Sequence, residues 1–465
     1  MTPLAGQPIL TAAAMRAAEE AAIAGGATVD SLMARAGAEV AAVVRRLAAG
    51  APVLVLCGPG NNGGDGYVVA TELMAAGHPV RVAASGEPRS EAARKARLGW
   101  SGPVESLEAA APAPILVDAL FGTGLSRALD WPVLKELARL RDGARLAIAV
   151  DLPSGVGTDD GALLSICPVF DITLALGAAK PAHLLQPAAH RCGKVRILDI
   201  GIEVNSDDYV LERPWCLSSP GPDAHKYSRG MVAIVAGAMP GAAELAAEAA
   251  LRVGAGYVLL LGSEAHGSPH AVVRRPWTAD ALDDPRIGTV LIGPGLGRDE
   301  SAKAKLDCVL ASDHHLVIDG DALHLLAEGR MERLARGGRD VVLTPHAGEF
   351  AALFGKPVGS KIDAARESAR RSGAYVVFKG ADTVIASPCL DGETITAEAS
   401  SDWLSTAGTG DVLAGAIAAC MLFYTKPASA IGDAVWLHAE AARRLGPAFI
   451  ADDLAKALTA ARASV

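Results

Sequence analysis

The sequence predicts an α/β protein with doubly wound parallel sheets, and three observations support this fold class. Short continuous apolar runs, such as the one at 53–57, alternate with stretches of helical periodicity, which is typical of parallel strands buried on both faces. The 50 glycines and 27 prolines supply tight turns between the elements. The 465 residues exceed what one hydrophobic core organises, so we expect more than one domain.

The first half of the chain begins with two helical patterns, at 11–24 and 29–49. A buried strand at 53–57 follows, and a glycine-rich loop at 58–66 leads from it into a helix at 67–76. This order predicts one parallel sheet with helices on both faces. Further buried strands are predicted at 80–84, 115–118, 146–151, 172–176 and 195–199.

The alternation lapses between 201 and 222, where polar and turn-forming residues replace the apolar runs. We place the domain boundary there, which gives domains at 1–212 and 213–465. The second half then restarts the same alternation. Its predicted strands are 231–236, 257–261, 290–292, 316–319, 341–343 and 375–379, and its predicted helices are 241–253, 300–310, 348–354, 411–423 and 431–444.

Composition and charge argue against several classes of partner. A net charge of −9 disfavours nonspecific binding to nucleic acid or to anionic membranes. The 7 cysteines are scattered without a CxxC pair, which favours reduced thiols over a disulfide framework or a zinc site. No signal peptide is evident, and the longest uncharged runs, such as 412–424, are too short to span a bilayer. We therefore expect a soluble, cytoplasmic protein.

The most informative stretch of the chain reads TAGTGDVLAG, at 406–415. Backbone N–H groups of the turn at 408–410 can converge on an anion at the start of the following helix, where unpaired donors and the helix dipole both point. Asp411 then lies in the first helical turn, where it can accept a proton from an attacking hydroxyl. The alternative is a loop-to-helix junction whose glycines only serve backbone geometry.

Three loops at the carboxyl ends of strands carry the polar residues of the first half, at 61–66, 118–127 and 151–154. Open α/β sheets bind their ligands at this edge. The Asn, Asp and Ser oxygens of these loops suit a hard cation such as potassium, and Arg127 suits a phosphate. The alternative is that the asparagine and serine side chains cap helices or turns and that the aspartates only end strands.

The runs GPGNNGGDG (58–66), VDALFGTGLSR (117–127) and DLPSGVGTDDG (151–161) together resemble the NAD(P)H-hydrate epimerase family, and the segments 10–37 and 180–202 are similar to it too. The resemblance spans essentially the whole first half. It implies a Rossmann-like three-layer αβα domain that interconverts the R and S epimers of hydrated NADH and NADPH with a bound potassium ion. The implied potassium ligands are Asn62, Asp118 and Ser154, and the implied substrate contacts are Asn61, Asn62, Gly63, Gly64, Asp65, Gly122, Thr123, Gly124, Leu125, Ser126, Arg127, Ala128 and Asp151.

Epimerisation at a carbon that bears a hydroxyl and a ring nitrogen can run through ring opening or through reversible loss of water. Either path needs a group that moves a proton, and we expect Asp151 to be that catalytic carboxylate. A lysine partner is expected near the second strand. The segment 82–89 offers only Arg89, which cannot release a proton, so the sequence does not identify the partner.

Polar residues follow several predicted strands of the second half, and we expect them to form one site with the stretch at 406–415. Lys379 can meet nucleotide phosphate charge, and carboxylates such as Asp319 or Glu349 can organise magnesium, usually through waters. His346 follows a strand, where it either contacts a ligand or caps a helix. The glycine-rich run at 293–297 is either a phosphate-approaching turn or an ordinary tight turn.

The second half resembles the ADP/ATP-dependent NAD(P)H-hydrate dehydratase family, a branch of the ribokinase-like α/β fold, from about 225 to 442. Characteristic runs are HKYSRG, IGPGLG, LTPHAGEF, FKGADT and GTGDVLAG. The resemblance implies that a phosphate from ADP or ATP turns the hydroxyl of the hydrate into a leaving group, with Asp411 as the catalytic base. It implies substrate contacts from Ala242, Gly297, His346 and Asp411, and nucleotide contacts from Lys379, Gly380, Ala381, Asp382, Thr383 and Gly410.

The whole sequence therefore predicts a bifunctional repair enzyme that epimerises hydrated NAD(P)H and dehydrates the S form at the expense of ADP, giving AMP and phosphate. One competing hypothesis is a ribokinase-like small-molecule kinase with an accessory N-terminal binding domain. Another makes the first half a non-catalytic scaffold. ADP versus ATP as donor, NADH versus NADPH hydrate, and assembly into a homo-oligomer are left open by the sequence.

Overall fold

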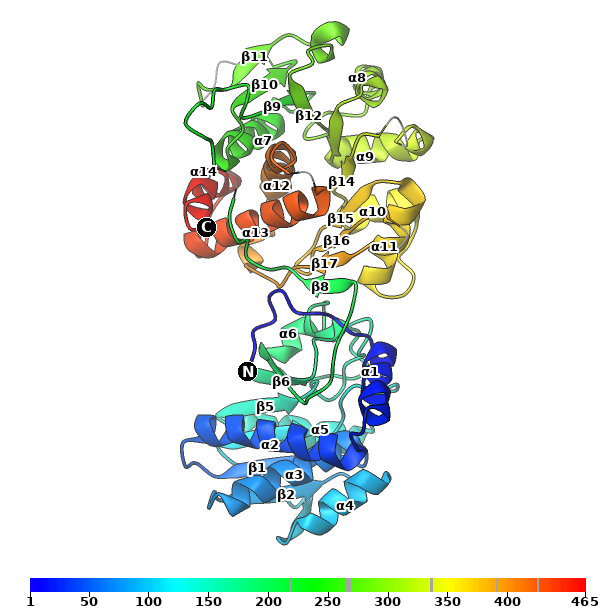
Figure 1. The fold of residues 1–465 in the computed structure, drawn as a ribbon, viewed down its shortest axis with the longest axis vertical. Helices are drawn as coiled ribbons and strands as arrows, with labels where there is room; N and C mark the ends of the chain where they lie inside the picture. Colours follow the sequence, from blue (N-terminus) through cyan, green and yellow to red (C-terminus); the bar gives the residue numbers. More distant parts are fainter. Residues whose placement is uncertain (218, 264–268, 335–337, 390–391, 425) are drawn as a thin grey trace. The chain divides into compact units, whose positions relative to one another are not determined.

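The computed structural model describes residues 1–217, 219–263, 269–334, 338–389, 392–424 and 426–465. The chain divides into two compact units, Met1–Val210 and Leu211–Val465 (Figure 1). Among the described residues, no helix combines the length and the hydropathy that a membrane crossing requires.

The first unit is built on a parallel sheet with the strand order β3-β2-β1-β4-β5-β6-β7 (Figure 1). The chain winds outward from β1 in both directions, so the loops that follow β1 and β4 lie side by side where the winding reverses. Ligands bind at such a switch point in open α/β sheets. The strands are β1 (Val53–Cys57), β2 (Val80–Ala84), β3 (Val104–Ser106), β4 (Ile115–Ala119), β5 (Leu146–Val150), β6 (Ile172–Leu176) and β7 (Lys194–Leu198), and β8 (Asp208–Val210) ends the unit.

Helices cover both faces of this sheet because successive strand side chains point to opposite sides. Val53 and Val55 pack with Val40 of α2, whereas Leu54 packs with Leu137 of α5 on the other face. The predicted doubly wound arrangement is confirmed. The helices of this unit are α1 (Ala12–Ala24), α2 (Val29–Ala48), α3 (Asn61–Ala75), α4 (Glu91–Gly99), α5 (Trp131–Asp142) and α6 (Ala189–Cys192).

Helix α3 begins at Asn61, so the prediction of a loop as far as residue 66 was wrong. Glycine disfavours helix, but here close packing outweighs that propensity. A Cβ added at Gly63 would lie 1.8 Å from the Gly58 oxygen, and one added at Gly66 would lie 2.8 Å from the Ala119 Cβ. The glycines therefore allow the first turns of α3 to pack closely against the loop after β1 and against β4.

The second unit contains a mixed sheet that runs in the order β11-β10-β9-β12-β13-β14-β15-β16-β17. The pairs from β11 to β15 are parallel, and β16 and β17 follow as antiparallel strands. The three-residue strands β11, β16 and β17 were not predicted. The strands are β9 (Met231–Val235), β10 (Tyr257–Leu261), β11 (Val273–Arg275), β12 (Ile287–Ile292), β13 (His315–Ile318), β14 (Val341–Leu343), β15 (Tyr375–Phe378), β16 (Val384–Ala386) and β17 (Thr394–Thr396).

Helices again cover both faces, with α7, α12, α13 and α14 on one side and α8 and α9 on the other (Figure 1). Helices α7 and α12 pack closely, and a Cβ added at Gly415 would lie only 2.1 Å from the Ala246 oxygen. The middle of α12 therefore lies directly against the backbone of α7. The helices are α7 (Pro240–Val253), α8 (Glu300–Ala311), α9 (Gly320–Ala327), α10 (Ala347–Phe354), α11 (Lys361–Ser372), α12 (Thr409–Cys420), α13 (Pro427–Leu445) and α14 (Ala451–Arg462).

Candidate active sites

The loops that follow β1, β4 and β5 meet around one cavity of about 580 Å³ in the first unit. Side chains of α1 and α2, such as Met15 and Met33, form its apolar wall. The structure thus brings most of the residues expected for the substrate to one place. These are Asn61, Asn62, Asp65, Gly122, Thr123, Gly124, Leu125 and Asp151, whereas Gly63, Gly64, Ser126, Arg127 and Ala128 lie outside the lining.

A buried ion pair lies on the wall of this cavity. The Asp151 Oδ1 atom accepts a hydrogen bond from the Lys180 ammonium at 2.5 Å, and Lys180 also donates to the Leu176 carbonyl at 2.6 Å. The Asp151 Oδ2 atom accepts from the Thr123 backbone N–H at 3.1 Å and from the Thr123 hydroxyl. Burial raises the pKa of Asp151, but Lys180 and these hydrogen bonds outweigh it and lower the pKa to about 2. Asp151 is therefore an ionised acceptor at neutral pH.

Asp151 also has an unusual backbone, with a φ of 65° in the left-handed region. Its carbonyl accepts a hydrogen bond from His183 Nε2 at 2.7 Å, while His183 Nδ1 accepts from the Lys180 backbone N–H at 2.9 Å. These two contacts fix the tautomer with the proton on Nε2. Burial, supported by the nearby Lys180 charge, lowers the pKa of His183 to about 4. The neutral imidazole therefore holds the turn that presents Asp151.

Two further carboxyl groups line the same cavity, Asp65 on α3 and Glu19 on α1. Burial raises the pKa of Asp65 well above its usual range, and the charges of Asp151 and Glu19 add to the effect. Asp65 therefore keeps its proton to a higher pH than the neighbouring Asp151 carboxyl does. The sequence did not single out Glu19, Lys180 or His183. The segment 180–202 was noticed only as a resemblance, and its lysine and histidine were given no role.

Of the residues expected to hold potassium, Asn62 lines the cavity, and the Ser154 hydroxyl accepts a hydrogen bond from the backbone N–H of the lining residue Phe121 at 2.9 Å. Asp118 is buried and accepts hydrogen bonds from the Ser154 hydroxyl at 2.8 Å, the Ser154 N–H at 3.0 Å and the Leu120 N–H at 3.1 Å. Burial raises the pKa of Asp118 to about 6, although these hydrogen bonds oppose the rise. A Cβ added at Gly122 would lie 3.1 Å from the Asn62 Oδ1 atom and 3.0 Å from the Asp151 Oδ2 atom, so these two oxygens flank Gly122.

This donor set consists of amide, carboxylate and hydroxyl oxygens. Within the described part of the chain, no three His, Cys, Asp or Glu side chains converge as they would for a transition metal. Oxygen ligands of this kind fit a hard monovalent cation. The Asn62 Nδ2 atom is buried without a hydrogen-bond partner among the described residues, so its amide is not fully satisfied within the protein.

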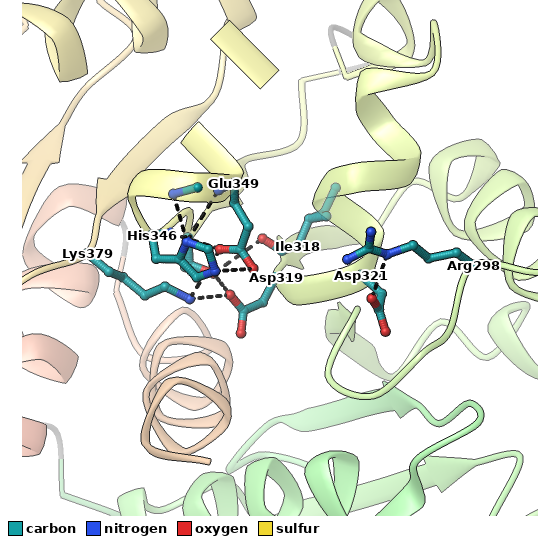
Figure 2. A network of polar contacts seen from close by, with 9 residues as sticks. Arg298, Ile318, Asp319, Asp321, His346, Glu349 and Lys379 are labelled. Carbon is teal, nitrogen blue, oxygen red and sulfur yellow. Dashed lines mark hydrogen bonds and ion pairs between the residues drawn. The ribbon is translucent and has the colours of Figure 1, made fainter. Parts of the chain in front are cut away.

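In the second unit, Lys379 lies close to two carboxylates, Asp319 directly after β13 and Glu349 in the first turn of α10 (Figure 2). The Lys379 Nζ atom lies 2.6 Å from the Asp319 Oδ1 atom and 3.8 Å from the Glu349 Oε2 atom. The Thr344 hydroxyl donates to the same Asp319 oxygen at 2.7 Å. Burial lowers the pKa of Lys379, but the surrounding carboxylates outweigh it and leave the pKa raised. Lys379 is therefore a permanent cation at the carboxyl end of this sheet.

Asp411 lies in the first turn of α12, directly after the glycine turn. Gly408 is the N-cap residue, and its φ of 88° lies in the left-handed region, which explains why a glycine occupies this position. A Cβ added at Gly410 would lie 3.5 Å from the Lys379 Nζ atom, so the Lys379 ammonium lies beside the glycine turn. Burial raises the pKa of Asp411 to about 7, with Asp319 and Glu349 adding to it and Lys379 opposing it. A carboxylate with this pKa is suited to take a proton at neutral pH.

A buried histidine supports the same turn. The His438 Nε2 atom, on α13, donates to the Thr409 carbonyl at 2.9 Å. Burial lowers the pKa of His438 to about 4, so the ring stays neutral. His438 was not predicted, because a lone histidine within a helix carries no sequence signal for the segment it contacts.

His346 forms the N-cap of α10, so it does cap a helix. Its Nδ1 atom accepts from the Gly348 N–H at 2.9 Å and the Glu349 N–H at 3.3 Å (Figure 2). Its own backbone N–H donates to Glu349 Oε2 at 2.8 Å. Its Nε2 atom lies 3.4 Å from the Glu349 Oε1 atom, and the side chain is 59% exposed, so part of the ring remains accessible to a ligand.

The remaining expected residues lie on turns at neighbouring strand and helix ends. Gly297 donates its N–H to Asp321 Oδ2 at 2.9 Å, and Asp321 also pairs with Arg298 at 2.9 Å (Figure 2). Ala242 lies in the first turn of α7, whose N-terminus has no side-chain cap. The turn at 379–383, which includes Ala381, is closed by a hydrogen bond from the Thr383 hydroxyl to the Gly380 carbonyl at 2.8 Å.

Comparison with known proteins finds matches along both units. Residues 29–182 match the family described as YjeF-related protein N-terminus, and residues 232–462 match the family described as NAD(P)H-hydrate dehydratase. The bifunctional NAD(P)H-hydrate repair enzyme Nnr of Salinibacter ruber is 34% identical, over 94% of this chain and 92% of that protein. The enzyme of the same name from Thermofilum pendens is 36% identical, over 84% and 82% of the two chains.

A solved structure of the ADP/ATP-dependent NAD(P)H-hydrate dehydratase from Bacillus subtilis, co-crystallized with ATP/Mg2+, is 28% identical. It covers 53% of this chain and 93% of that chain, with a TM-score of 0.46.

Proposed function

The chain belongs to the family of bifunctional NAD(P)H-hydrate repair enzymes, and from this we propose how its two sites divide the work. The protein epimerises the R and S forms of hydrated NADH and NADPH, and it dehydrates the S form to NAD(P)H at the expense of an adenine nucleotide. Relatives that match along both units favour this activity over a small-molecule kinase with an accessory domain, and over a first unit that is only a scaffold.

We assign epimerisation to the cavity of the first unit, and the Asp151–Lys180 ion pair is the observation that carries this assignment. Ring opening of the hydrate removes a proton from its hydroxyl, breaks the bond from carbon to ring nitrogen and adds a proton to that nitrogen. Closure on the opposite face reverses these transfers and inverts the carbon. Asp151 accepts the hydroxyl proton and the adjacent Lys180 ammonium supplies the other. Asp65, whose pKa is raised by burial, lies on the lining of the same cavity, where its carboxyl can hydrogen-bond the substrate.

A potassium ion would be held by Asn62, Asp118 and Ser154, whose oxygens fit it. When bound, it would supply a fixed positive charge at the substrate site. If this proposal is right, replacing potassium with a large organic cation abolishes epimer exchange but leaves the protein folded. Ser154→Ala should raise the potassium concentration needed for half-maximal exchange. Epimer exchange at full rate without any alkali cation would contradict the proposal.

We assign dehydration to the second unit, and the Asp411 carboxyl beside Lys379 is the observation that supports it. Asp411 takes the proton from the hydroxyl of the hydrate, whose oxygen then attacks the terminal phosphorus of ADP, and AMP leaves. Lys379 and the N–H groups of the glycine turn at 408–410 stabilise the charge on the transferred phosphoryl group. Elimination of phosphate from the ring, with loss of a proton from the neighbouring carbon, restores NAD(P)H. Magnesium would be held by Asp319 and Glu349, where it supplies charge neutralisation for the phosphates.

Incubating both epimers of hydrated NADH with the protein, with and without ADP, tests the assignment. Without nucleotide, the R and S forms should equilibrate and no NADH should appear. With ADP, both forms should be consumed and NADH and AMP should accumulate. A stable phosphorylated product instead of NADH would support the kinase alternative. The cytoplasmic location, a homo-oligomeric state and ADP rather than ATP as donor stay predictions.

A further inference from the structure

Lys361, the first residue of α11, reaches over the turn at 379–383. Its Nζ atom donates to the Asp382 Oδ1 atom at 2.6 Å and to the Lys379 carbonyl at 3.3 Å. It also lies 4.5 Å from the ring centroid of Phe378. The Lys361 side chain is only 16% exposed. A single buried ammonium therefore binds the chain on both sides of Gly380.

Gly380 is required by this ion pair rather than by backbone conformation. Its φ does not lie in the left-handed region that favours glycine. A Cβ added there would lie 2.6 Å from the Lys361 Nζ atom and 2.8 Å from the Asp382 Oδ1 atom. The ion pair thus lies directly over the Gly380 backbone, and a side chain at this position would require the ends of the Lys361 and Asp382 side chains to shift.

The position of Lys361 is unfavourable for helix stability. A cation in the first turn of a helix opposes the helix dipole, and burying an ammonium carries a desolvation cost. The N-terminus of α11 is already capped by Ser360 and Asp363, which form a capping box. Lys361 is therefore not needed to begin the helix, and its burial is best explained by the shape that it gives to the turn.

The contact with the Lys379 carbonyl connects this clamp to the proposed nucleotide site. The Lys379 backbone is held by Lys361, while its side chain extends to Asp319 and lies beside Gly410. Lys361 thus links Lys379 and Asp382, near the two ends of the turn, and holds the backbone from which the Lys379 side chain extends.

We propose that Lys361 is a positioning residue for the adenine nucleotide: through Asp382 and the Lys379 carbonyl, it holds the turn at 379–383 in the shape that receives the nucleotide. This inference rests on the proposed assignment of that turn to nucleotide binding. Lys361 itself acts through the turn and takes no part in proton or phosphoryl transfer.

The test compares Lys361→Met, Lys361→Arg and Lys379→Met in the full-length chain. Lys361→Met should weaken ADP binding, measured by calorimetry, and raise the KM for ADP by about 10- to 100-fold, because hydrogen bonds to a charged group are lost. The kcat at saturating ADP should stay within about 3-fold of the unaltered chain, since a positioning residue contributes mainly to binding. Lys361→Arg should recover part of the affinity. Epimer exchange by the same polypeptide measures the amount of folded first unit, and Lys356→Met, an exposed lysine nearby, is the matched control.

Three results would overturn the inference. Unchanged ADP affinity in Lys361→Met, with weakened binding in Lys379→Met, would remove the role of Lys361 but leave the nucleotide assignment standing. Unchanged ADP affinity in both variants would show that the turn does not bind the nucleotide at all. A fall in melting temperature and kcat without any change in the KM for ADP would show that Lys361 is only structural.

Discussion

Asp151 and Lys180 form a buried ion pair at 2.5 Å between Oδ1 and Nζ, although they belong to loops after different strands. Asp151 follows β5 and Lys180 follows β6, and these strands are neighbours in the sheet. The pair therefore exists because of the strand order. It supplies the first unit with an acceptor and a donor at a single point of the cavity wall.

Replacing Lys180 with Met should reduce epimer exchange by about 10²- to 10⁴-fold, because the proton donor is lost. The same change leaves the buried Asp151 carboxylate without its charged partner and should destabilise the first unit by about 3–5 kcal/mol. The double variant Asp151→Asn with Lys180→Met removes both charges, so it should regain stability but not activity. The measurements are epimer exchange by NMR and urea unfolding.

Lys194→Met, at an exposed lysine of β7, is the control for that experiment and should behave like the unaltered chain. Recovery of epimer exchange in the double variant would contradict the proposed roles of both residues.

The dehydration rate should depend on the ionisation of Asp411. Its pKa is raised to about 7, so the ionised fraction increases with pH below that value. With ADP saturating, kcat/KM for the S hydrate should rise about tenfold per pH unit below 7 and level off above it. Asp411→Asn should abolish NADH formation at every pH while epimer exchange continues. A flat pH profile, or loss of both activities in Asp411→Asn, would refute the division of labour.

Gly415→Ala should destabilise the second unit. The added Cβ would lie 2.1 Å from the Ala246 oxygen, and overpacking of this kind costs about 1–3 kcal/mol, more than alanine contributes through helix propensity. Dehydration should therefore be lost at a lower temperature than in the unaltered chain, with epimer exchange retained. Gly432→Ala on α13 is the matched control, since its added Cβ finds no atom closer than 3.4 Å. Equal heat sensitivity of the two variants would show that α7 can move away.

His183 should make the first unit acid-sensitive. Its pKa is about 4 in the folded chain, below the ordinary histidine pKa of 6.5 that applies to the unfolded chain, so the unfolded chain binds the proton first as the pH falls. The stability contributed by the neutral ring is present above pH 6.5 and is lost on going down to pH 4, by roughly 3 kcal/mol. The raised pKa values of Asp65 and Asp118 stabilise the folded chain as the pH falls. The contribution of His183 must therefore be measured as a difference between two variants.

His183→Gln provides that difference. The gap in free energy of unfolding between this variant and the unaltered chain should narrow from pH 7 to pH 4, measured by hydrogen exchange of β5 and β6. A gap that stays constant with pH would show that His183 does not titrate on unfolding.

The central strands of each sheet could be predicted because they are continuous apolar runs in the sequence. The strand at 53–57 has the predicted bounds, and it is buried at every position. The start of α3 could not be predicted, since glycine-rich sequence indicates a loop unless the neighbouring atoms at Gly58 and Ala119 are known. The strands β16 and β17 have three residues each, too few for a period to emerge.

The site residues show the same limit. Asp118 and Asp151 lie at the ends of apolar strands, and Asp411 follows a glycine turn at the start of a helix. Such positions can be recognised in a sequence. A lysine partner was expected near the second strand, where the sequence has only Arg89, whereas the lysine that pairs with Asp151 is Lys180, from the loop after β6. No local sequence pattern indicates that Lys180 is buried, because its burial depends on Asp151, which follows the neighbouring strand.

The left-handed backbone of Asp151 restricts which residues this position can accept. Only glycine adopts such a φ freely, and Asn and Asp tolerate it better than other side chains. An alanine there would add backbone strain of about 1 kcal/mol on top of the lost carboxylate. Asparagine matches both the shape and the conformation of aspartate, so Asp151→Asn isolates the chemistry of the carboxylate. Alanine scanning would overstate its catalytic share by including the strain of the turn.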